Sequence, residues 1–202
     1  LTEPVQLTYK DFDNNGTIDP ILSYYIQGVS YPFPSLNELL TQLNTLRRKF
    51  PDYSSYANAR LIDVFSPEDL QSADVLTASE LRTVLYINEG SRFVKKDLPV
   101  EAQFSPVHAI EVFDYNNDGN PDLILGGNQN AMCVRLGVMD ANYGQLYEGD
   151  GKGNFRHIPQ DISGLTIIGD VRSLKTMTVN GRLYLFAGVS NHGVAAYIMN
   201  SK

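Results

Sequence analysis

Two short stretches of the chain place oxygen-bearing side chains at the same alternating positions. The first runs from Asp11 to Asp19 and the second from Asp114 to Asp122, with Asp or Asn at loop positions 1, 3, 5 and 9 and glycine at position 6. A hard cation such as Ca²⁺ takes about six to eight oxygen ligands, and a tight turn with this spacing supplies most of them. Position 7 would offer a backbone carbonyl, and the glycine permits the positive φ with which the chain curls around an ion. We therefore expect two metal-binding loops.

The residues after each loop distinguish two kinds of calcium site. In an EF-hand, position 12 is a bidentate Glu, whereas this position is Leu22 in the first loop and Leu125 in the second. Both loops lie between an alternating stretch and a short apolar run, which is typical of strands. The flanking stretches are 6–10 and 20–26 for the first loop, and 109–113 and 123–127 for the second. The sequence predicts a strand–calcium loop–strand hairpin and argues against an EF-hand.

A simpler interpretation is that these residues only make turns, because Asp and Asn side chains bond their own backbone. That interpretation explains a single loop as well as a metal does. Two copies in the same register, each between strands, favour the metal. Magnesium is less suitable than calcium because it keeps several waters and uses few protein ligands.

A repeat of about 61 residues runs through the chain. The strand–turn–strand pattern of 85–93 recurs at 146–155, and a hydrophobic–proline pair follows each copy. A third, degenerate copy aligns 183–191 with 122–130 and places Gly127 over Gly188. Its turn contains Asn180-Gly181 and no carboxylates, so we expect a plain hairpin without metal.

Periodic four-strand units of this size are typical of propeller blades. A parallel solenoid with longer repeats is the alternative, and the hairpin turns favour antiparallel blades. The expected fold is mainly β, with about three antiparallel propeller-type blades forming a partial β-propeller in a single repeat domain over 1–202. We expect blade one at 1–101 with a helical insert at about 30–78, blade two at 102–161, and blade three, without a metal loop, at 162–202.

The insert carries clear helix signals. Ser35 and Glu38 form a predicted capping box, leucines recur on one face as far as Phe50, and Pro51 ends the helix. A second short helix is expected at Ser66-Pro67. We expect the leucine face to pack on the adjacent blade, with a peptide-binding groove as the alternative.

The segments Phe113 to Leu123 and Leu146 to Phe155 together resemble the FG-GAP (VCBS-type) repeat. Such repeats form the calcium-loop blades of integrin α-subunit propellers and of large bacterial surface or secreted proteins. The resemblance covers about two-thirds of the chain and leaves out the insert, and it implies that this chain is part of a larger propeller that supplies the remaining blades. Matched residue by residue, it implies these calcium ligands: Asp11, Asp13, Asn15, Thr17 (carbonyl), Asp19, Asp114, Asn116, Asp118, Asn120 (carbonyl) and Asp122.

Composition narrows the function further. The net charge of −7 arises from 23 acidic and 16 basic residues, and six of the acids lie in the two loops. Two bound calcium ions would bring the net charge to −3. We expect no nucleic-acid partner, since no basic stripe is present, and no membrane span, since no apolar run is long enough. The single cysteine, Cys133, lies in an apolar run and is expected to be a buried, inert thiol.

No catalytic constellation is evident in the sequence. The three histidines lack zinc-ligand spacing, and segment 188–193 misses the nucleophile elbow by one position. We expect a non-enzymatic calcium-binding module of an extracellular or cell-surface protein that binds a protein or a glycan. The alternative is an accessory or catalytic domain of a secreted hydrolase acting on glycans, because the spatial separation of paired carboxylates is invisible in sequence.

Overall fold

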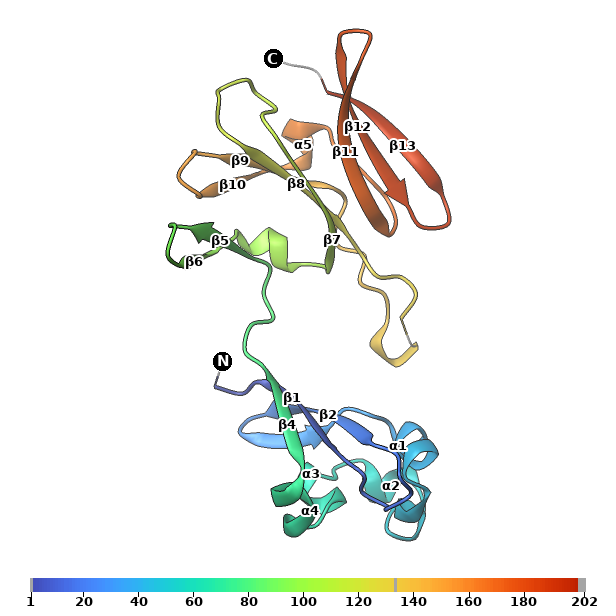
Figure 1. Ribbon diagram of the computed structural model, residues 1–202. Helices are drawn as coiled ribbons and strands as arrows, with labels where there is room; N and C mark the ends of the chain where they lie inside the picture. The colour runs from blue at the N-terminus through green and yellow to red at the C-terminus, as the bar shows by residue number, and fades with distance from the viewer. Residues whose placement is uncertain (1, 133, 200–202) are drawn as a thin grey trace. The chain divides into compact units, whose positions relative to one another are not determined.

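The structure is a computed structural model that describes residues 2–132 and 134–199. Cys133, and with it the predicted buried thiol, lies outside the described residues. The chain divides into two compact units, Leu1–Leu81 and Arg82–Lys202 (Figure 1), and each is described by itself. Among the described residues, no helix is long and apolar enough to cross a membrane.

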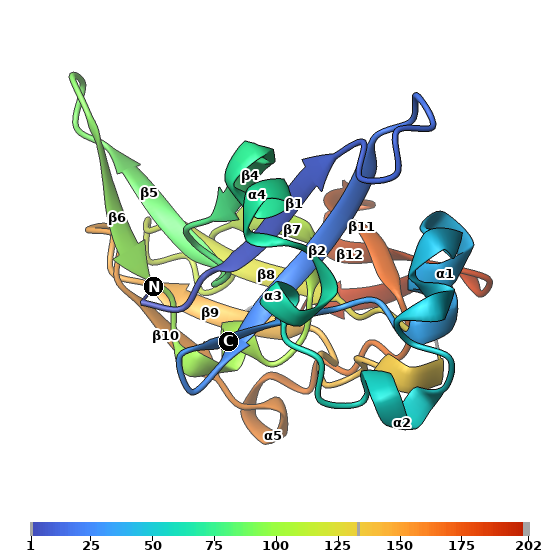
Figure 2. The same ribbon diagram turned by 90° about the horizontal axis from the view of Figure 1, so that it is seen from below.

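The first unit contains one four-stranded antiparallel sheet in the order β3-β2-β1-β4. Along β2 the side chains alternate, and those on the buried face include Ile21 and Ser23, both 0% exposed. The loop between β1 and β2 extends beyond the ends of both strands (Figure 2). The strands are β1 Val5–Lys10, β2 Asp19–Ile26, β3 Val29–Pro32 and β4 Asp74–Ala78.

Short helices cover the buried face of this sheet. Ser35 and Glu38 form the predicted capping box at the start of α1, and Ser66 caps α4 with Pro67 at its first position. The predicted leucine face packs on Ile21 of its own sheet in one apolar cluster. The elements are α1 Leu36–Gln42, the 3₁₀ helix η1 Asn44–Arg48, α2 Tyr53–Tyr56, α3 Leu61–Val64 and α4 Pro67–Ser72.

The second unit contains a two-stranded hairpin and two larger sheets. The larger sheets are antiparallel meanders in the orders β10-β9-β8-β7 and β11-β12-β13. The strands are β5 Val84–Asn88, β6 Phe93–Asp97, β7 Val107–Phe113, β8 Asp122–Gly127, β9 Gln145–Gly149, β10 Phe155–Ile158, β11 Val171–Val179, β12 Arg182–Val189 and β13 Gly193–Met199. The helices are η2 Val100–Gln103, η3 Val134–Leu136 and α5 Gln160–Ser163.

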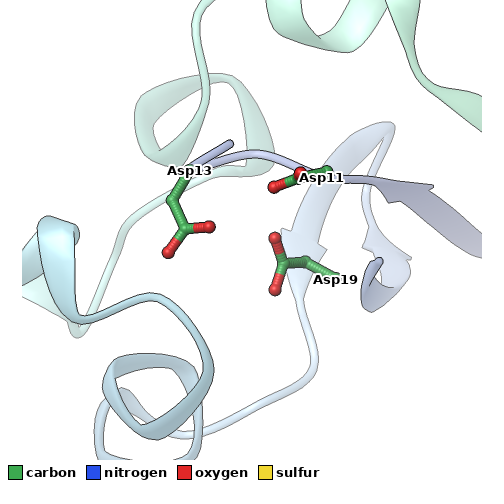
Figure 3. A group of neighbouring side chains, drawn as sticks. All are labelled: Asp11, Asp13 and Asp19. Atoms are coloured by element: carbon green, nitrogen blue, oxygen red, sulfur yellow. The ribbon is translucent and has the colours of Figure 1, made fainter. Parts of the chain in front are cut away.

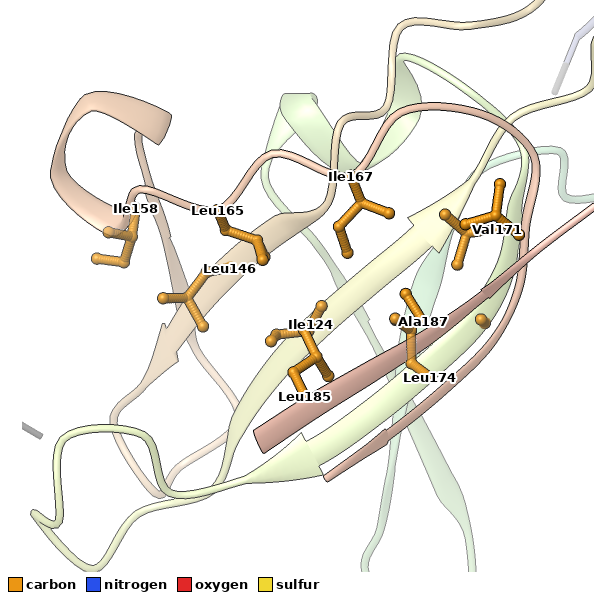
Figure 4. Packing of buried hydrophobic residues seen from close by; sticks show 11 residues of the cluster. Ile124, Leu146, Ile158, Leu165, Ile167, Val171, Leu174, Leu185 and Ala187 are labelled. Atoms are coloured by element: carbon orange, nitrogen blue, oxygen red, sulfur yellow. The ribbon is translucent and has the colours of Figure 1, made fainter. Parts of the chain in front are cut away.

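The central strand β8 is buried along its whole length because both faces of its sheet are covered. On one face, Ile124 packs with Leu146, Leu174 and Leu185 in an apolar layer between the two larger sheets (Figure 4). On the other face, Leu123 and Leu125 pack with Tyr147 and with Ala102 of η2. Because side chains pack against both faces of β8, the strand is held in place, and so is Asp122 at its start.

The predicted mainly β fold is confirmed. The described residues form four antiparallel sheets, and none of these closes into a barrel. The two hairpins of the repeat are also found, as β5–β6 and β9–β10, and a proline caps a short helix after each of them.

The arrangement of the first sheet differs from the predicted blade. The sequence assigns the hairpin at 85–93 to the blade that begins at residue 1. In the structure this hairpin belongs to the second unit, and β4 pairs instead with β1, with Leu7 opposite Leu76. The strand that completes the first sheet therefore comes from the end of the helical insert.

A shared β-bulge corrects the predicted register of the repeat by one residue. The β7–β8 pairing shifts between Val107 and Ala109, and the β11–β12 pairing shifts between Val171 and Ser173. Ala109 then pairs with Gly126, and Ser173 pairs with Gly188. With the bulge as the common reference point, the residue equivalent to Gly188 is Gly126, one position before the predicted Gly127.

A buried carboxylate joins the two larger sheets. Glu111 of β7 is 6% exposed and accepts hydrogen bonds from the backbone N–H of Thr176 (2.8 Å), the Thr176 hydroxyl (2.6 Å) and Lys175 Nζ (2.9 Å) of β11. Burial alone would raise the pKa of Glu111, but the hydrogen bonds from Thr176 and Lys175 outweigh it and lower the pKa.

We expect Glu111→Gln to lower the free energy of unfolding at pH 7 by about 1–2 kcal/mol. Because the folded-state pKa is depressed, the stabilisation is present above the unfolded pKa and is lost as the pH falls through the folded pKa. The difference between wild type and variant should therefore shrink below about pH 4. Urea unfolding at several pH values measures it. Glu89→Gln, which removes only an exposed pair with Arg92, should give no such pH-dependent difference.

Candidate metal centre

The first loop connects β1 to β2 and is closed by the pair Lys10 and Asp19. Its side-chain oxygens accept hydrogen bonds from the loop's own backbone. Asp11 accepts from the N–H groups of Asn15 (3.0 Å) and Gly16 (2.8 Å). The remaining bonds run from Asn15 N to Asp13 Oδ1 (3.2 Å), from Thr17 N to Asn15 Oδ1 (2.8 Å) and from Phe12 N to Asp19 Oδ2 (3.0 Å).

The second loop connects β7 to β8 and repeats this network bond for bond. Asp114 accepts from the N–H groups of Asp118 (3.1 Å) and Gly119 (2.8 Å). The remaining bonds run from Asp118 N to Asn116 Oδ1 (3.1 Å), from Asn120 N to Asp118 Oδ1 (2.8 Å) and from Tyr115 N to Asp122 Oδ2 (2.9 Å). The two loops therefore share one conformation, although they belong to different units.

The backbone takes left-handed conformations at the same two positions in each loop. Position 4 has φ of 58° at Asn14 and 59° at Asn117, and position 6 has φ of 88° at Gly16 and 84° at Gly119. Asparagine and glycine are the residues that adopt such angles most readily. The sequence therefore places the required residue types where the loop turns.

Three carboxylates converge in the first loop. Asp11, Asp13 and Asp19 each offer an oxygen, and these oxygens lie within 4.8 Å of one another (Figure 3). Asp19 is 2% exposed, and none of the three forms an ion pair within the described part of the chain. The second loop also contains three carboxylates, those of Asp114, Asp118 and Asp122, because Asn116 replaces the carboxylate of position 3 and Asp118 supplies one at position 5.

This donor set fits a hard divalent cation. All the side-chain donors are oxygens, as calcium prefers, and the convergence of like charges in the first loop is unfavourable without a counter-charge. The backbone N–H bonds hold these oxygens in place and leave each of them a further lone pair, since a carboxylate oxygen can accept more than one bond. The predicted ligand residues lie in the two turns between paired strands, and the carboxylates of Asp11, Asp13 and Asp19 lie together in the first.

The last position of the second loop has a partner outside the loop. Asp122 is 0% exposed, and its Oδ1 accepts the backbone N–H of Gly149 at the end of β9 (2.8 Å). Burial raises the pKa of Asp122, the N–H groups of Gly149 and Tyr115 oppose this, and the nearby Asp118 and Asp114 add to it. Sequence reasoning missed Gly149, because nothing in the loop motif indicates which strand lies beside it.

Basic residues lie beside the first loop. Asp13 borders a surface depression together with Asn44, Thr45, Arg47 and Arg48 of η1. The two arginines place positive charge near the carboxylate of Asp13.

The third copy of the repeat has the expected plain turn. Val179 pairs with Arg182, and the two residues between them, Asn180 and Gly181, have φ of 51° and 76°. Positive φ at both central positions is the type I′ geometry of a two-residue hairpin. This turn is too short to wrap an ion.

No protein-family model matches the chain, and no curated protein sequence matches it.

Proposed function

We propose that the chain is a non-enzymatic calcium-binding β-repeat module of an extracellular or cell-surface protein, in which two ions stabilise turns and the exposed surface binds a protein or a glycan. The observation that carries the proposal is the set of five hydrogen bonds that recur by position in the two loops. Ordinary Asx turns need one such bond each, whereas here five side-chain acceptor contacts recur with the same partners by position.

The proposal extends to propeller-type blades of the FG-GAP kind. The meander β7–β10 and the meander β11–β13 pack face to face through an apolar layer, as successive blades do, and a calcium-loop hairpin opens the first of them. The β1–β2 hairpin of the first unit carries the same loop in the same pairing. These features support the blade interpretation, and the missing blades would come from a longer parent protein.

The proposed compartment follows from the expected affinity. Extracellular calcium modules bind at about 10⁻⁴–10⁻³ M, so the loops would be filled outside the cell, where calcium is millimolar. Each ion bound only to the folded state at ten times its dissociation constant adds about 1.4 kcal/mol of stability.

The test is thermal unfolding by circular dichroism in chelator and in millimolar calcium. We expect calcium to raise the melting temperature by several degrees, and magnesium to do so less. Asp13→Ala and Asp118→Ala should each remove part of this gain, one loop at a time. Asp150→Ala is the matched control, because Asp150 accepts N–H bonds in the β9–β10 turn outside both loops. If calcium leaves the melting temperature of wild type unchanged, the proposal is wrong.

A further inference from the structure

A small surface depression of the second unit lies beside η2, on the face of the β7–β10 sheet that this helix covers. Its volume is about 170 Å³, and four segments meet there: η2, the start of β9, the strand β10 and the first residue of α5. The lining side chains that could contact a ligand are Glu101, Phe104, Tyr143, Gln145, His157 and Gln160. All six lie outside the two metal loops, so the depression is a separate candidate site.

Two exposed aromatic rings border the depression. Phe104 and Tyr143 are 54% and 42% exposed, and in the described part of the chain neither ring stacks on another. The backbone of Tyr143 is held in place, because its carbonyl accepts the N–H of Ile167 (2.8 Å). An aromatic ring can cover the apolar C–H face of a sugar while its edge stays in water. The two rings therefore offer stacking surfaces that the fold itself does not use.

One lining side chain is a buried amide with a fixed orientation. Gln145 is 7% exposed. Its Oε1 accepts hydrogen bonds from the Tyr147 hydroxyl (3.0 Å) and from Asn142 Nδ2 (3.3 Å), and its Nε2 donates to the carbonyl of Glu101 (2.6 Å). An amide nitrogen has two hydrogens, and within the described residues only one of these has a partner. The second N–H is therefore a donor already positioned for a ligand.

The other polar side chains add acceptors and donors. Glu101 Oε1 lies 3.8 Å from His157 Nδ1, which is too far for a hydrogen bond. The imidazole of His157 packs against the ring of Tyr147, with the ring centroids 5.4 Å apart. Gln160 Nε2 donates to the carbonyl of Leu165 (3.2 Å), which leaves its Oε1 as an acceptor. Such a mixture of donors and acceptors suits hydroxyl groups, because each hydroxyl both donates and accepts.

We propose that this depression binds a single neutral pyranose residue of a glycan. The aromatic rings would stack on the C–H faces of the sugar, and the amide, carboxylate and imidazole groups would bond its hydroxyls. The volume is smaller than the roughly 300–1,000 Å³ of sites for larger ligands, so the depression accommodates one ring. Its lining carries the carboxylate of Glu101 and, among the described residues, neither lysine nor arginine. Acidic sugars are therefore disfavoured by like-charge repulsion.

The inference rests on the binding role in the proposed function and selects a glycan as the partner. A protein is the alternative partner, but standard protein interfaces bury about 800 Å² on each side, which a depression of this size does not supply. The glycan site does not depend on calcium, since none of the predicted calcium ligands lines it.

Proton NMR with the methyl glycosides of glucose, galactose, mannose and N-acetylglucosamine tests the proposal. We expect at least one of the four to bind with a dissociation constant on the order of 1 mM. Binding should shift the imidazole signals of His157 and leave those of His108, an exposed residue outside the depression, unchanged. The uronic acid form of the same glycoside, with a carboxylate in place of the hydroxymethyl group, should bind roughly fivefold more weakly.

Phe104→Ala and Tyr143→Ala should each weaken this binding by about tenfold. Tyr86→Ala is the matched control and should bind as wild type does, because Tyr86 is 53% exposed on β5 and lies outside the depression. Glu101→Gln keeps an acceptor and should narrow the difference between the neutral and the acidic glycoside. These side chains are all at least partly exposed, so circular dichroism should show that the variants are folded.

Four results would each overturn the proposal: no neutral glycoside that binds in the millimolar range, binding that leaves His157 unchanged, ring variants that bind like wild type, or a preference for the acidic glycoside. A protein that binds this depression while all four glycosides fail would overturn it as well. If the glycosides fail but calcium still raises the melting temperature, the glycan site is wrong and the calcium-binding part of the proposed function stands.

Discussion

Asp122→Asn is expected to lower the free energy of unfolding of the second unit by about 3 kcal/mol, even in chelator. Asp122 is fully buried, and its two oxygens each accept a backbone N–H, from Tyr115 and from Gly149. An asparagine can satisfy only one of these donors. Its amide group would point N–H at the other donor, and a buried unpaired donor carries the full desolvation cost.

Urea unfolding followed by circular dichroism and tyrosine fluorescence measures the loss. Asp19→Asn is the matched control at the same loop position of the first unit. Among the described residues, Asp19 accepts one backbone hydrogen bond, from Phe12 N–H to its Oδ2. An asparagine can accept that bond with its carbonyl, so we expect a loss of only about 1 kcal/mol in chelator. Equal losses in the two variants would show that the bond from Gly149 does not distinguish the loops.

The two loops differ in how the geometry of each turn is fixed. In the second unit, Gly149 of β9 holds the carboxylate of Asp122, so part of the loop geometry is fixed by the fold. In the first unit, Asp19 has no such contact with a neighbouring strand among the described residues, so more of the loop geometry depends on a counter-charge. We therefore expect calcium to stabilise the first unit more than the second.

Features encoded within a few residues were predictable from sequence. The capping box at Ser35, the proline start after Ser66, and the Asn180-Gly181 turn all follow from local backbone preferences, and the structure contains each of them. The loop conformation belongs to this class as well, because its hydrogen bonds join residues no more than about seven positions apart.

Features that depend on long-range pairing were not predictable. The first sheet is completed by β4, which returns to β1 after the whole helical insert, and many strands could have taken that edge. The predicted continuous helix as far as Phe50 is also broken. Leu43 leaves the helical conformation (φ −122°, ψ 75°), and a 3₁₀ segment then carries the chain to Phe50, so that both side chains reach the core at 1% and 5% exposure. Core packing here overrides the helical periodicity.

Gly127 lies so close to the backbone of Pro106 that a larger residue would destabilise the fold. An added Cβ at Gly127 would overlap the carbonyl oxygen of Pro106 and lie 2.9 Å from its carbonyl carbon. That oxygen accepts the N–H of Asn128 (3.0 Å), so the backbone of Pro106 cannot move away without losing this bond. We expect Gly127→Ala to lower the free energy of unfolding by about 3 kcal/mol, at the upper end for overpacking.

Gly188→Ala is the informative comparison, since the sequence alignment made these glycines equivalent. A Cβ at Gly188 would meet the Ser173 hydroxyl, with the Ser173 Cβ at 3.6 Å. A hydroxyl can rotate to another rotamer, so we expect a loss of about 1 kcal/mol or less. Thermal and urea unfolding of the two variants should therefore differ clearly. If both glycines tolerate alanine equally, the bulge does not bring Pro106 against β8, and the sequence register of 61 residues would describe the repeat better than the structural register.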